Sequence, residues 1–182
     1  MRHGNTSGAG ILAALLLILV SACTTSSAAT SKAAKAQPSP SIAADSLAGG
    51  CAGTVLTESE PPAWAQAGWT VDSSKPWPVP WALGTNSEAL AYVFAGQLVA
   101  GVSPRADGSN NKVLWLNREG SSMVVVGRPI GKSQPVVTMP GGPSITDVPA
   151  PGCWSFTLSW TSNGKHTSTV NLDVLPAGTL PH

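Results

Sequence analysis

Residues 153–175 read CWSFTLSWTSNGKHTSTVNLDVL, and they contain the clearest secondary-structure pattern in the chain. Large apolar residues alternate with hydroxyl residues in WSFTLSW (154–160) and with polar residues in VNLDV (170–174). Strict alternation is typical of a strand that has one face in a core and the other in water. The stretch therefore predicts two strands, Cys153–Thr161 and His166–Leu175.

The turn between these two strands determines which side chains share a face. A two-residue Asn-Gly loop would place Phe156 opposite Asn171 and would put the two apolar sets on opposite faces of the hairpin. A three-residue loop over 162–164 places Trp154 opposite Leu172 instead, so that all the large apolar residues lie on one side. We therefore predict a three-residue loop, built as a type I turn with its glycine in the left-handed region and a bulge.

Upstream of this hairpin, the chain consists of short β-type runs separated by Gly, Pro, Asn and Asp, and no stretch has a sustained helical period. This spacing is typical of an all-β sandwich or barrel. We predict an antiparallel β-sandwich of about seven or eight strands over residues 51–178, a size at which a core forms without help from a cofactor. The remaining expected strands are Ala89–Phe94, Gln97–Val102, Lys112–Asn117, Ser122–Val126, Pro135–Met139 and Ser144–Val148.

The first 22 residues follow the order of a bacterial secretory signal. Arg2 precedes the apolar run ILAALLLILV (11–20), which is too short to span a bilayer comfortably. The following LVSAC (19–23) resembles the bacterial lipobox, whose cysteine receives a diacylglyceryl group and becomes the new N-terminus. We expect a lipoprotein signal peptide over 1–22 and lipid attachment at Cys23, holding the chain at the extracytoplasmic face of the cell membrane. An ordinary cleaved signal with a chance cysteine is the alternative.

Residues 23–50 predict a tether between the lipid and the folded part. From Thr24 the segment reads TTSSAATSKAAKAQPSPSIAADSLAGG, with no aromatic residue and almost no branched aliphatic one. Such a composition buries too little apolar surface to offset the entropy of ordering, so we expect a flexible Ser/Thr/Ala/Pro linker.

The chain has three cysteines, and a lipid on Cys23 leaves an even pair. Outside the cytoplasm we expect Cys51 and Cys153 to be oxidised to one another, which would tie the start of the domain to its last hairpin. Two separate thiols are the alternative.

Charge and motif content favour a non-catalytic domain. The chain has ten basic and nine acidic residues, so it lacks the excess of positive charge that is typical of nucleic-acid-binding proteins. The histidines, methionines and acidic residues show no metal-ligand spacing, and no Gly-x-Ser-x-Gly elbow is present. GRPIGKS (127–133) has one residue too few between its glycines for a phosphate loop, so we interpret it as a connection between strands. We expect His166 to pack across from Trp160.

Tryptophan is the unusual residue, with seven copies against one Tyr and two Phe. Four of the seven lie in PPAWAQAGW and KPWPVPW, where proline prevents regular strand pairing. Their indoles are predicted either to pack against the sheet or to line a ligand groove suited to sugar rings or a proline-rich ligand. These four residues are Trp64, Trp69, Trp77 and Trp81.

The segment GPSITDVPAPGCWSFTL (142–158) resembles one found in uncharacterised, largely actinobacterial, secreted proteins and lipoproteins. NNKVLWL (110–116) and PAWA (62–65) are similar to the same group, so the likeness covers most of residues 60–175. The resemblance implies an immunoglobulin-like β-sandwich and no assigned activity, and it supplies no catalytic residues.

These observations lead to three functional hypotheses. The first is a membrane-anchored extracytoplasmic lipoprotein with a non-catalytic β-sandwich that serves as a binding or structural module for a cell-envelope protein or glycan. The second is a glycan- or peptidoglycan-binding module that uses the Pro/Trp segment. The third is an extracytoplasmic enzyme with an unrecognised site.

Overall fold

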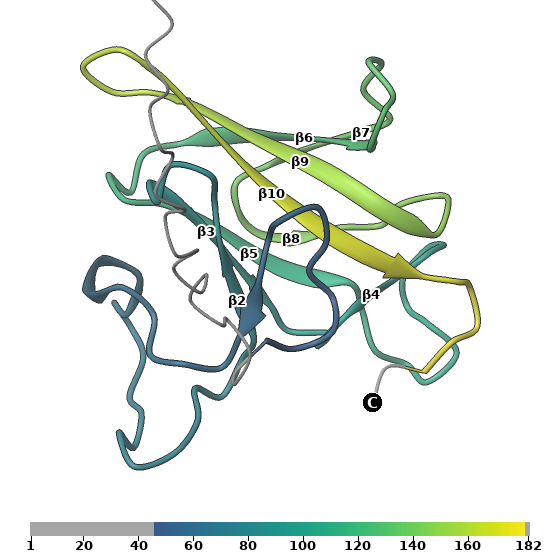
Figure 1. The fold of residues 1–182 in the computed structure, drawn as a ribbon, viewed down its shortest axis with the longest axis horizontal. Helices are drawn as coiled ribbons and strands as arrows, with labels where there is room; N and C mark the ends of the chain where they lie inside the picture. Colours follow the sequence, from purple (N-terminus) through teal and green to yellow (C-terminus); the bar gives the residue numbers. More distant parts are fainter. Residues whose placement is uncertain (1–45, 181–182) are drawn as a thin grey trace, which may run out of the picture. The chain divides into compact units, whose positions relative to one another are not determined.

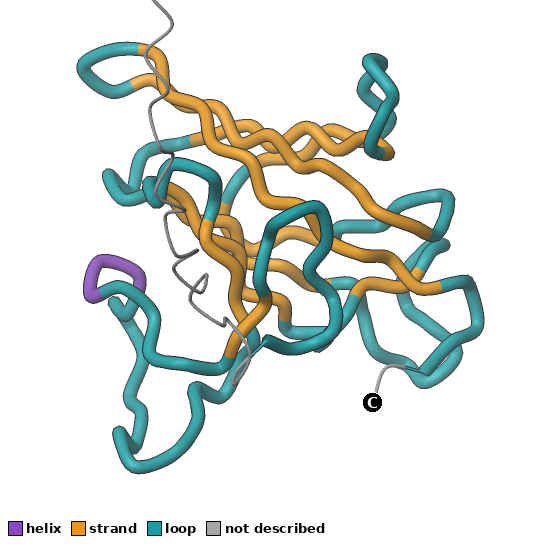
Figure 2. Tube along the Cα trace, viewed as in Figure 1, coloured by secondary structure: helices purple, strands orange, loops and turns teal. Residues whose placement is uncertain are grey.

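The computed structural model describes residues 46–180, which form two five-stranded sheets packed face to face (Figures 1 and 2). Apart from one short 3-10 turn, η1 (Ala63–Ala65), the described residues form strands and loops. The predicted β-sandwich is confirmed, while its immunoglobulin-like classification stays a prediction. The strands are β1 (Leu56–Thr57), β2 (Trp81–Leu83), β3 (Ala89–Val93), β4 (Leu98–Val99), β5 (Lys112–Asn117), β6 (Met123–Pro129), β7 (Val137–Pro140), β8 (Gly142–Ile145), β9 (Gly152–Thr161) and β10 (Lys165–Leu175).

The chain passes repeatedly from one sheet to the other. The first sheet, here called sheet A, has the strand order β1-β2-β3-β5-β8, and the second, sheet B, has the order β4-β10-β9-β6-β7. All neighbouring strands are antiparallel except β4, which pairs in parallel with the end of β10. The short strand β4 therefore closes one edge of sheet B.

The closing hairpin has the predicted register. Trp154 lies opposite Leu172 and Phe156 opposite Val170, and all four side chains are buried. The loop over 162–164 has three residues, as predicted, but it is not a type I turn. Asn163 already adopts a positive φ of 42°, and the glycine that follows it has a φ of 146°. Asparagine tolerates the left-handed region better than most residues, so the reversal is spread over two positions.

The core lies between the two sheets and is built around aromatic side chains. Trp115 of sheet A contacts Phe156 of sheet B with ring centroids 5.2 Å apart, and Trp154 stacks on Phe156 at 6.4 Å. All three rings are fully buried, together with aliphatic residues of both sheets. Burial of aromatic and aliphatic surface on this scale is the main force that holds the sheets together.

The structure also contains pairings that the sequence patterns did not predict. β1 and β2 lie in the Pro/Trp-rich part of the chain, and the expected strand over 97–102 is reduced to the two residues of β4. Leu47 and Gly50, placed in the tether by composition, form isolated bridges with Leu56 and Leu172. The folded part therefore begins before the predicted boundary at Cys51.

The predicted disulfide between Cys51 and Cys153 is present, with Cα atoms 6.0 Å apart. Cys153 is next to the inward-facing Trp154 in β9, so its side chain points to the outer face of sheet B. The backbone amide of Cys51 donates to the carbonyl of Asn171 in β10 at 3.3 Å. The bond therefore fastens the incoming chain across the outside of sheet B rather than joining the two sheets through the core.

Removing this crosslink is expected to destabilise the domain. The bond joins residues separated by 102 positions. Closing a loop of that length restricts the unfolded chain and thereby raises the free energy of unfolding by at most roughly 4–5 kcal/mol. The double variant Cys51→Ser/Cys153→Ser should show a correspondingly lower free energy of unfolding in urea, followed by tryptophan fluorescence. The wild-type protein measured in reductant is the control and should behave like the variant. An unchanged midpoint in both would contradict the assignment.

Gly127 allows β6 to approach its neighbours closely. A Cβ atom there would lie 2.6 Å from Cγ2 of Val137 and 2.8 Å from Cε1 of Phe156. Gly127→Ala is therefore expected to overpack the core and to lower the free energy of unfolding by about 1–3 kcal/mol. Val124→Thr, on the exposed face of the same strand, is the matched control and should change it by about 0.5 kcal/mol or less. Equal stability of the two variants in urea denaturation would show that the core adapts without cost.

Candidate functional site

The four tryptophans of the Pro/Trp segment gather on the outer face of sheet A. The chain between β1 and β2 folds over this face, on the side of β2 and β3 away from sheet B (Figure 1). There Ala65, Trp77 and Trp81 are buried, and Trp64 and Trp69 are half-buried. As a result β3 is buried on both of its faces.

Contacts within this cluster are close and aromatic. The ring of Trp69 lies 5.5 Å from Trp77 and 5.2 Å from Tyr92, measured between centroids. The indole N–H of Trp81 donates to the carbonyl of Ser59 at 2.8 Å. Trp77 and Trp81 retain only 5% and 8% of their exposure, so these two rings serve as packing for sheet A. The structure thus brings the four side chains together on the outer face of sheet A, where Trp81 belongs to β2 and the other three belong to the chain that covers the sheet.

Tyr92 holds the cover to the sheet by a single buried hydrogen bond. Its hydroxyl donates to the carbonyl of Ala65 in η1 at 2.9 Å. Burial raises the pKa of Tyr92 from 10.0 to about 12, because the phenolate would lose the solvation that water gives it. No sequence pattern indicated this contact, since it joins residues on separate elements.

The raised pKa of Tyr92 predicts a loss of stability in alkali. As the pH rises from 10 to about 12, the unfolded chain releases the phenol proton while the folded chain retains it, so the free energy of unfolding falls across this window. In Tyr92→Phe this contribution should be absent, although the variant starts from a lower stability. Urea titrations of both proteins between pH 9 and 12 test this, and parallel curves would contradict it.

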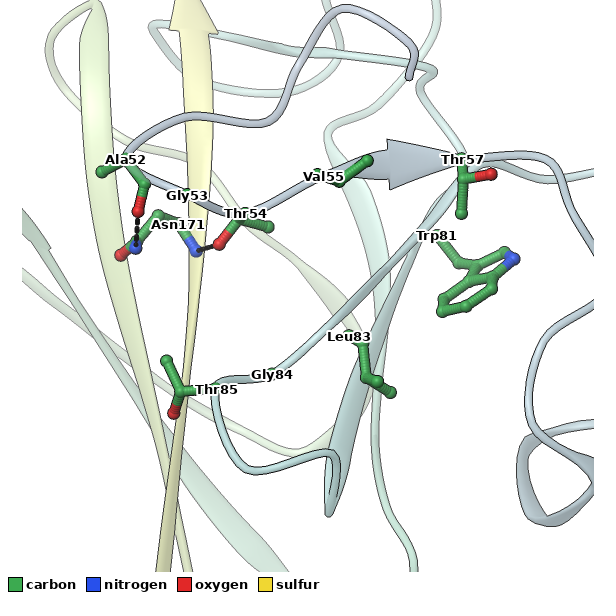
Figure 3. A pocket seen from close by; sticks show the side chains of 10 residues that line it. All are labelled: Ala52, Gly53, Thr54, Val55, Thr57, Trp81, Leu83, Gly84, Thr85 and Asn171. Atoms are coloured by element: carbon green, nitrogen blue, oxygen red, sulfur yellow. Dashed lines mark hydrogen bonds between the residues drawn. The ribbon is translucent and has the colours of Figure 1, made fainter. Parts of the chain in front are cut away.

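A hollow of about 490 Å³ lies between the segment 52–57 and the start of the β2–β3 connection (Figure 3). The backbone amide of Asn171 donates to Oγ1 of Thr54 at 2.9 Å, and its Nδ2 donates to the carbonyl of Ala52 at 3.3 Å. Among the described residues, no charged side chain lines this hollow. Its walls are formed by Ala52, Gly53, Thr54, Val55, Thr57, Trp81, Leu83, Gly84, Thr85 and Asn171.

The chemistry of this hollow is that of a neutral polar site. The hydroxyl groups of Thr57 and Thr85 can donate and accept hydrogen bonds, and Trp81 and Leu83 supply apolar surface. A combination of a few polar groups with an aromatic wall suits an uncharged hydroxylated ligand. None of the lining residues can act as a general acid or base near neutral pH, so the hollow is equipped to bind rather than to transfer protons.

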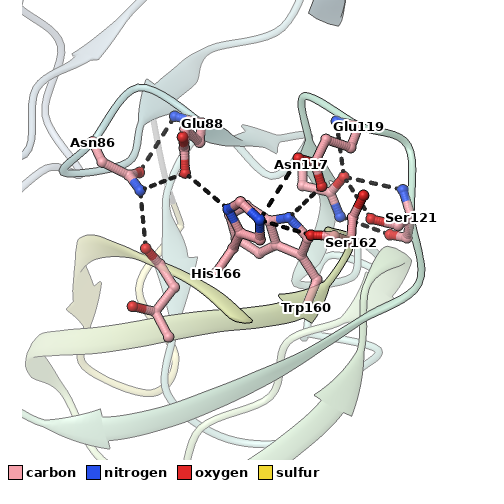
Figure 4. A network of polar contacts seen from close by, with 9 residues as sticks. Asn86, Glu88, Asn117, Glu119, Ser121, Trp160, Ser162 and His166 are labelled. Atoms are coloured by element: carbon pink, nitrogen blue, oxygen red, sulfur yellow. Dashed lines mark hydrogen bonds and ion pairs between the residues drawn. The ribbon is translucent and has the colours of Figure 1, made fainter. Parts of the chain in front are cut away.

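His166 lies at the opposite end of β10 within a network of polar contacts (Figure 4). Its ring stacks on Trp160 at 5.4 Å, as predicted. Its Nδ1 lies 3.6 Å from Oε2 of Glu88, and its Nε2 lies 3.8 Å from Oε1 of Glu119 and 2.9 Å from the carbonyl oxygen of Ser162. Because Glu88 and Glu119 belong to loops that flank strands of sheet A, the histidine links the two sheets at this end.

These contacts assign a structural role to His166. A carbonyl oxygen can only accept, so Nε2 must carry a proton to bond with Ser162. A nucleophilic triad needs a hydroxyl at a histidine nitrogen, whereas here the two ring nitrogens face carboxylates and a carbonyl. Trp160 completes the arrangement by donating from its indole N–H to Oε2 of Glu119 at 2.9 Å.

Two further findings concern residues 46–180. In this part of the chain no helix is long and apolar enough to cross a bilayer. Nor do three or more His, Cys, Asp or Glu side chains meet there as a set of metal ligands. The expected lipid attachment site, Cys23, lies outside the described residues, together with the signal peptide and most of the tether.

Comparison of the chain with protein-family models, with curated proteins and with solved structures finds no match. The resemblance based on the Gly-Cys-Trp segment therefore stays a prediction. What can be said of the function follows from the residues and their arrangement.

Proposed function

We propose that this chain is a lipoprotein anchored through Cys23 at the extracytoplasmic face of the cell membrane, with a β-sandwich that serves as a non-catalytic binding or structural module. The observation that carries the proposal is the disulfide between Cys51 and Cys153. Disulfides form and persist in oxidising compartments outside the cytoplasm. The bond thus supports the export that the leader sequence predicts.

The position of the disulfide also suits a tethered domain. The chain enters the sandwich along the edge of β10, where Gly50 bridges to Leu172 and the amide of Asp173 donates to Gly49 at 2.8 Å. A pull on the N-terminal segment would peel these few hydrogen bonds from the edge of the sheet one at a time. The crosslink from Cys51 to Cys153 passes such a load directly to β9, which is a central strand of sheet B.

A neutral glycan is the second candidate ligand class, and the hollow of Figure 3 favours it. Trp81, one of the four predicted groove residues, contributes to that hollow together with Leu83 and three hydroxyl-bearing threonines. The other three indoles do not line it. If the module binds a neutral sugar, the aromatic contact comes from Trp81 alone.

Substitution of the proposed lipid site tests the anchor. Cys23→Ala should abolish incorporation of an alkyne-labelled fatty acid and should move the protein from the membrane fraction to the medium, because the leader remains exportable but nothing holds the product. The measurement is fluorescence of the labelled lipid on a gel, with immunoblots of the membrane, cytosol and medium.

Ser26→Ala, three residues further along the chain, is the matched control and should remain labelled and membrane-bound. Retention of Cys23→Ala on the membrane would contradict lipid anchoring. Recovery of the wild-type protein from the cytosol with reduced cysteines would contradict export as a whole.

A further inference from the structure

Within residues 46–180 the outer face of sheet B is open over most of β9 and β10, in contrast to the covered outer face of sheet A, and only near Asn171 does the segment 52–54 lie against it. The inward-facing residues of β9 and β10, apart from His166 and Ser168, are apolar core residues, so their neighbours point outward. Lys165 and Asp173 occupy outward positions towards the two ends of β10, and over 155–159 of β9 and 167–171 of β10 the outward side chains are uncharged and able to hydrogen-bond. They are Ser155, Thr157 and Ser159 on β9, and Thr167, Thr169 and Asn171 on β10.

A hollow of about 390 Å³ lies on this face, beside the β6–β7 connection. In Figure 1 that connection stands away from the sheet next to β6 and β7, on the side opposite to sheet A. It forms one wall of the hollow, and the floor is formed by hydroxyl residues of β9 and β10. The lining residues with polar side chains are Arg128, Lys132, Ser155, Thr157 and Thr169.

Arg128 is fixed at the edge of this hollow by neutral partners. Its Nη1 donates to the carbonyl of Ser133 at 3.3 Å, and its Nη2 donates to Oγ1 of Thr157 at 3.1 Å. Among residues 46–180 it forms no ion pair. Of the five guanidinium N–H groups, three remain free of these contacts. The side chain is therefore oriented while its full positive charge stays uncompensated.

The surroundings add a second positive charge and only one negative charge. Lys132 is exposed in the wall of the hollow. The only acidic side chain at an outward position of β6, β9 or β10 is Asp173, whose Oδ2 accepts from Nε2 of Gln97 at 3.1 Å. Because the whole chain is nearly neutral, two cations in one hollow without a carboxylate in its lining mark a local preference for an anion.

The strand register connects this hollow with that of Figure 3. Arg128 lies opposite Ser155, and Ser155 lies opposite Asn171, so the three side chains form one row across β6, β9 and β10. Adjacent strands are about 4.8 Å apart, which places the ends of the row about 10 Å from each other. Asn171 lines the neutral hollow described above. A cationic subsite and a neutral one thus lie at the two ends of one row.

We propose that this face binds an anionic chain of polyhydroxylated units, either an acidic oligosaccharide or a polyol phosphate. Arg128 and Lys132 hold a carboxylate or phosphate of one unit, and the hydroxyls of Ser155, Thr157 and Thr169 bond to its sugar or polyol hydroxyls. The remaining units of the ligand continue across the row of side chains towards Asn171. A guanidinium bonds oxyanions in a bidentate manner, and its neutral partners here leave that capacity free. The inference rests on the proposed binding role of the module and is independent of the lipid anchor.

Titration calorimetry of the purified full chain tests this inference. The probes are oligogalacturonate, which carries carboxylates, poly(glycerol phosphate), which carries phosphates, and methyl-esterified oligogalacturonate, which has the same backbone without charge. At least one of the two charged probes should bind, the esterified probe should bind much more weakly, and added salt should weaken the binding. Arg128→Gln should weaken it about tenfold or more, and Arg128→Lys less.

Arg118→Gln is the matched control, because it removes one positive charge from an exposed loop residue outside the hollow. It should leave the affinity unchanged within about twofold. The inference would be overturned if neither charged probe bound, if the esterified probe bound equally well, or if Arg128→Gln and Arg128→Lys both bound like the wild type. Inorganic phosphate binding as tightly as the polymers would contradict the role of the hydroxyls. If one of these results were obtained while membrane retention still depended on Cys23, the proposed lipid anchor would be unaffected.

Discussion

The register of the hairpin β9–β10 determines which side chains are buried between the two sheets and which face solvent. Side chains in a strand alternate between two faces, so a shift of one residue would exchange the buried and exposed sets. The three-residue loop fixes the pairing that brings Trp154 and Phe156 to the same side as Leu172 and Val170. The same pairing places the hydroxyl residues of the two strands, except the buried Ser168, on the other side. The core and the open polar face are two consequences of one register.

The two outer faces of the sandwich differ in how much of them is covered by other parts of the chain. Sheet A is covered by the Pro/Trp segment, and its strand β3 is buried on both sides, with Leu90 and Tyr92 facing the cover. Within residues 46–180 sheet B has no such cover, and the chain lies against its outer face at the disulfide of Cys51 and at Asn171. The face that carries Arg128 is thus the one left open to solvent. This asymmetry is the structural reason for placing ligand recognition on sheet B.

Much of the architecture could be predicted from local patterns. Strict alternation gave the closing hairpin and its register, and the bounds of β5 agree with the predicted Lys112–Asn117. The disulfide was predicted because setting Cys23 aside leaves an even pair of cysteines. The stacking of His166 on Trp160 followed from the register. These features depend on period-two patterning or on pairwise chemistry, both of which a sequence displays directly.

What could not be predicted depends on contacts between distant segments. β1 and β2 have two and three residues, too few for alternation to be recognised, and the residues before β2 include three prolines in KPWPVP (75–80). The candidate anion site is dispersed across three strands and a loop, because Arg128, Ser155 and Asn171 meet only through strand pairing. In the sequence, Arg128 and Lys132 belong to a segment whose glycine spacing argued against a phosphate loop. Their side chains, rather than the backbone amides, supply the attraction for an anion.

Engineered cysteine pairs in β9 and β10 measure the central register most directly. Thr157 and Thr169 lie opposite each other on the outer face, so Thr157→Cys with Thr169→Cys should form a disulfide on mild oxidation. Thr157→Cys with Val170→Cys should not, because Val170 points into the core. Peptide mapping by mass spectrometry distinguishes the new bond from the native one. Crosslinking of the second pair in place of the first would show that the strands are shifted by one residue and would contradict both the core and the open face.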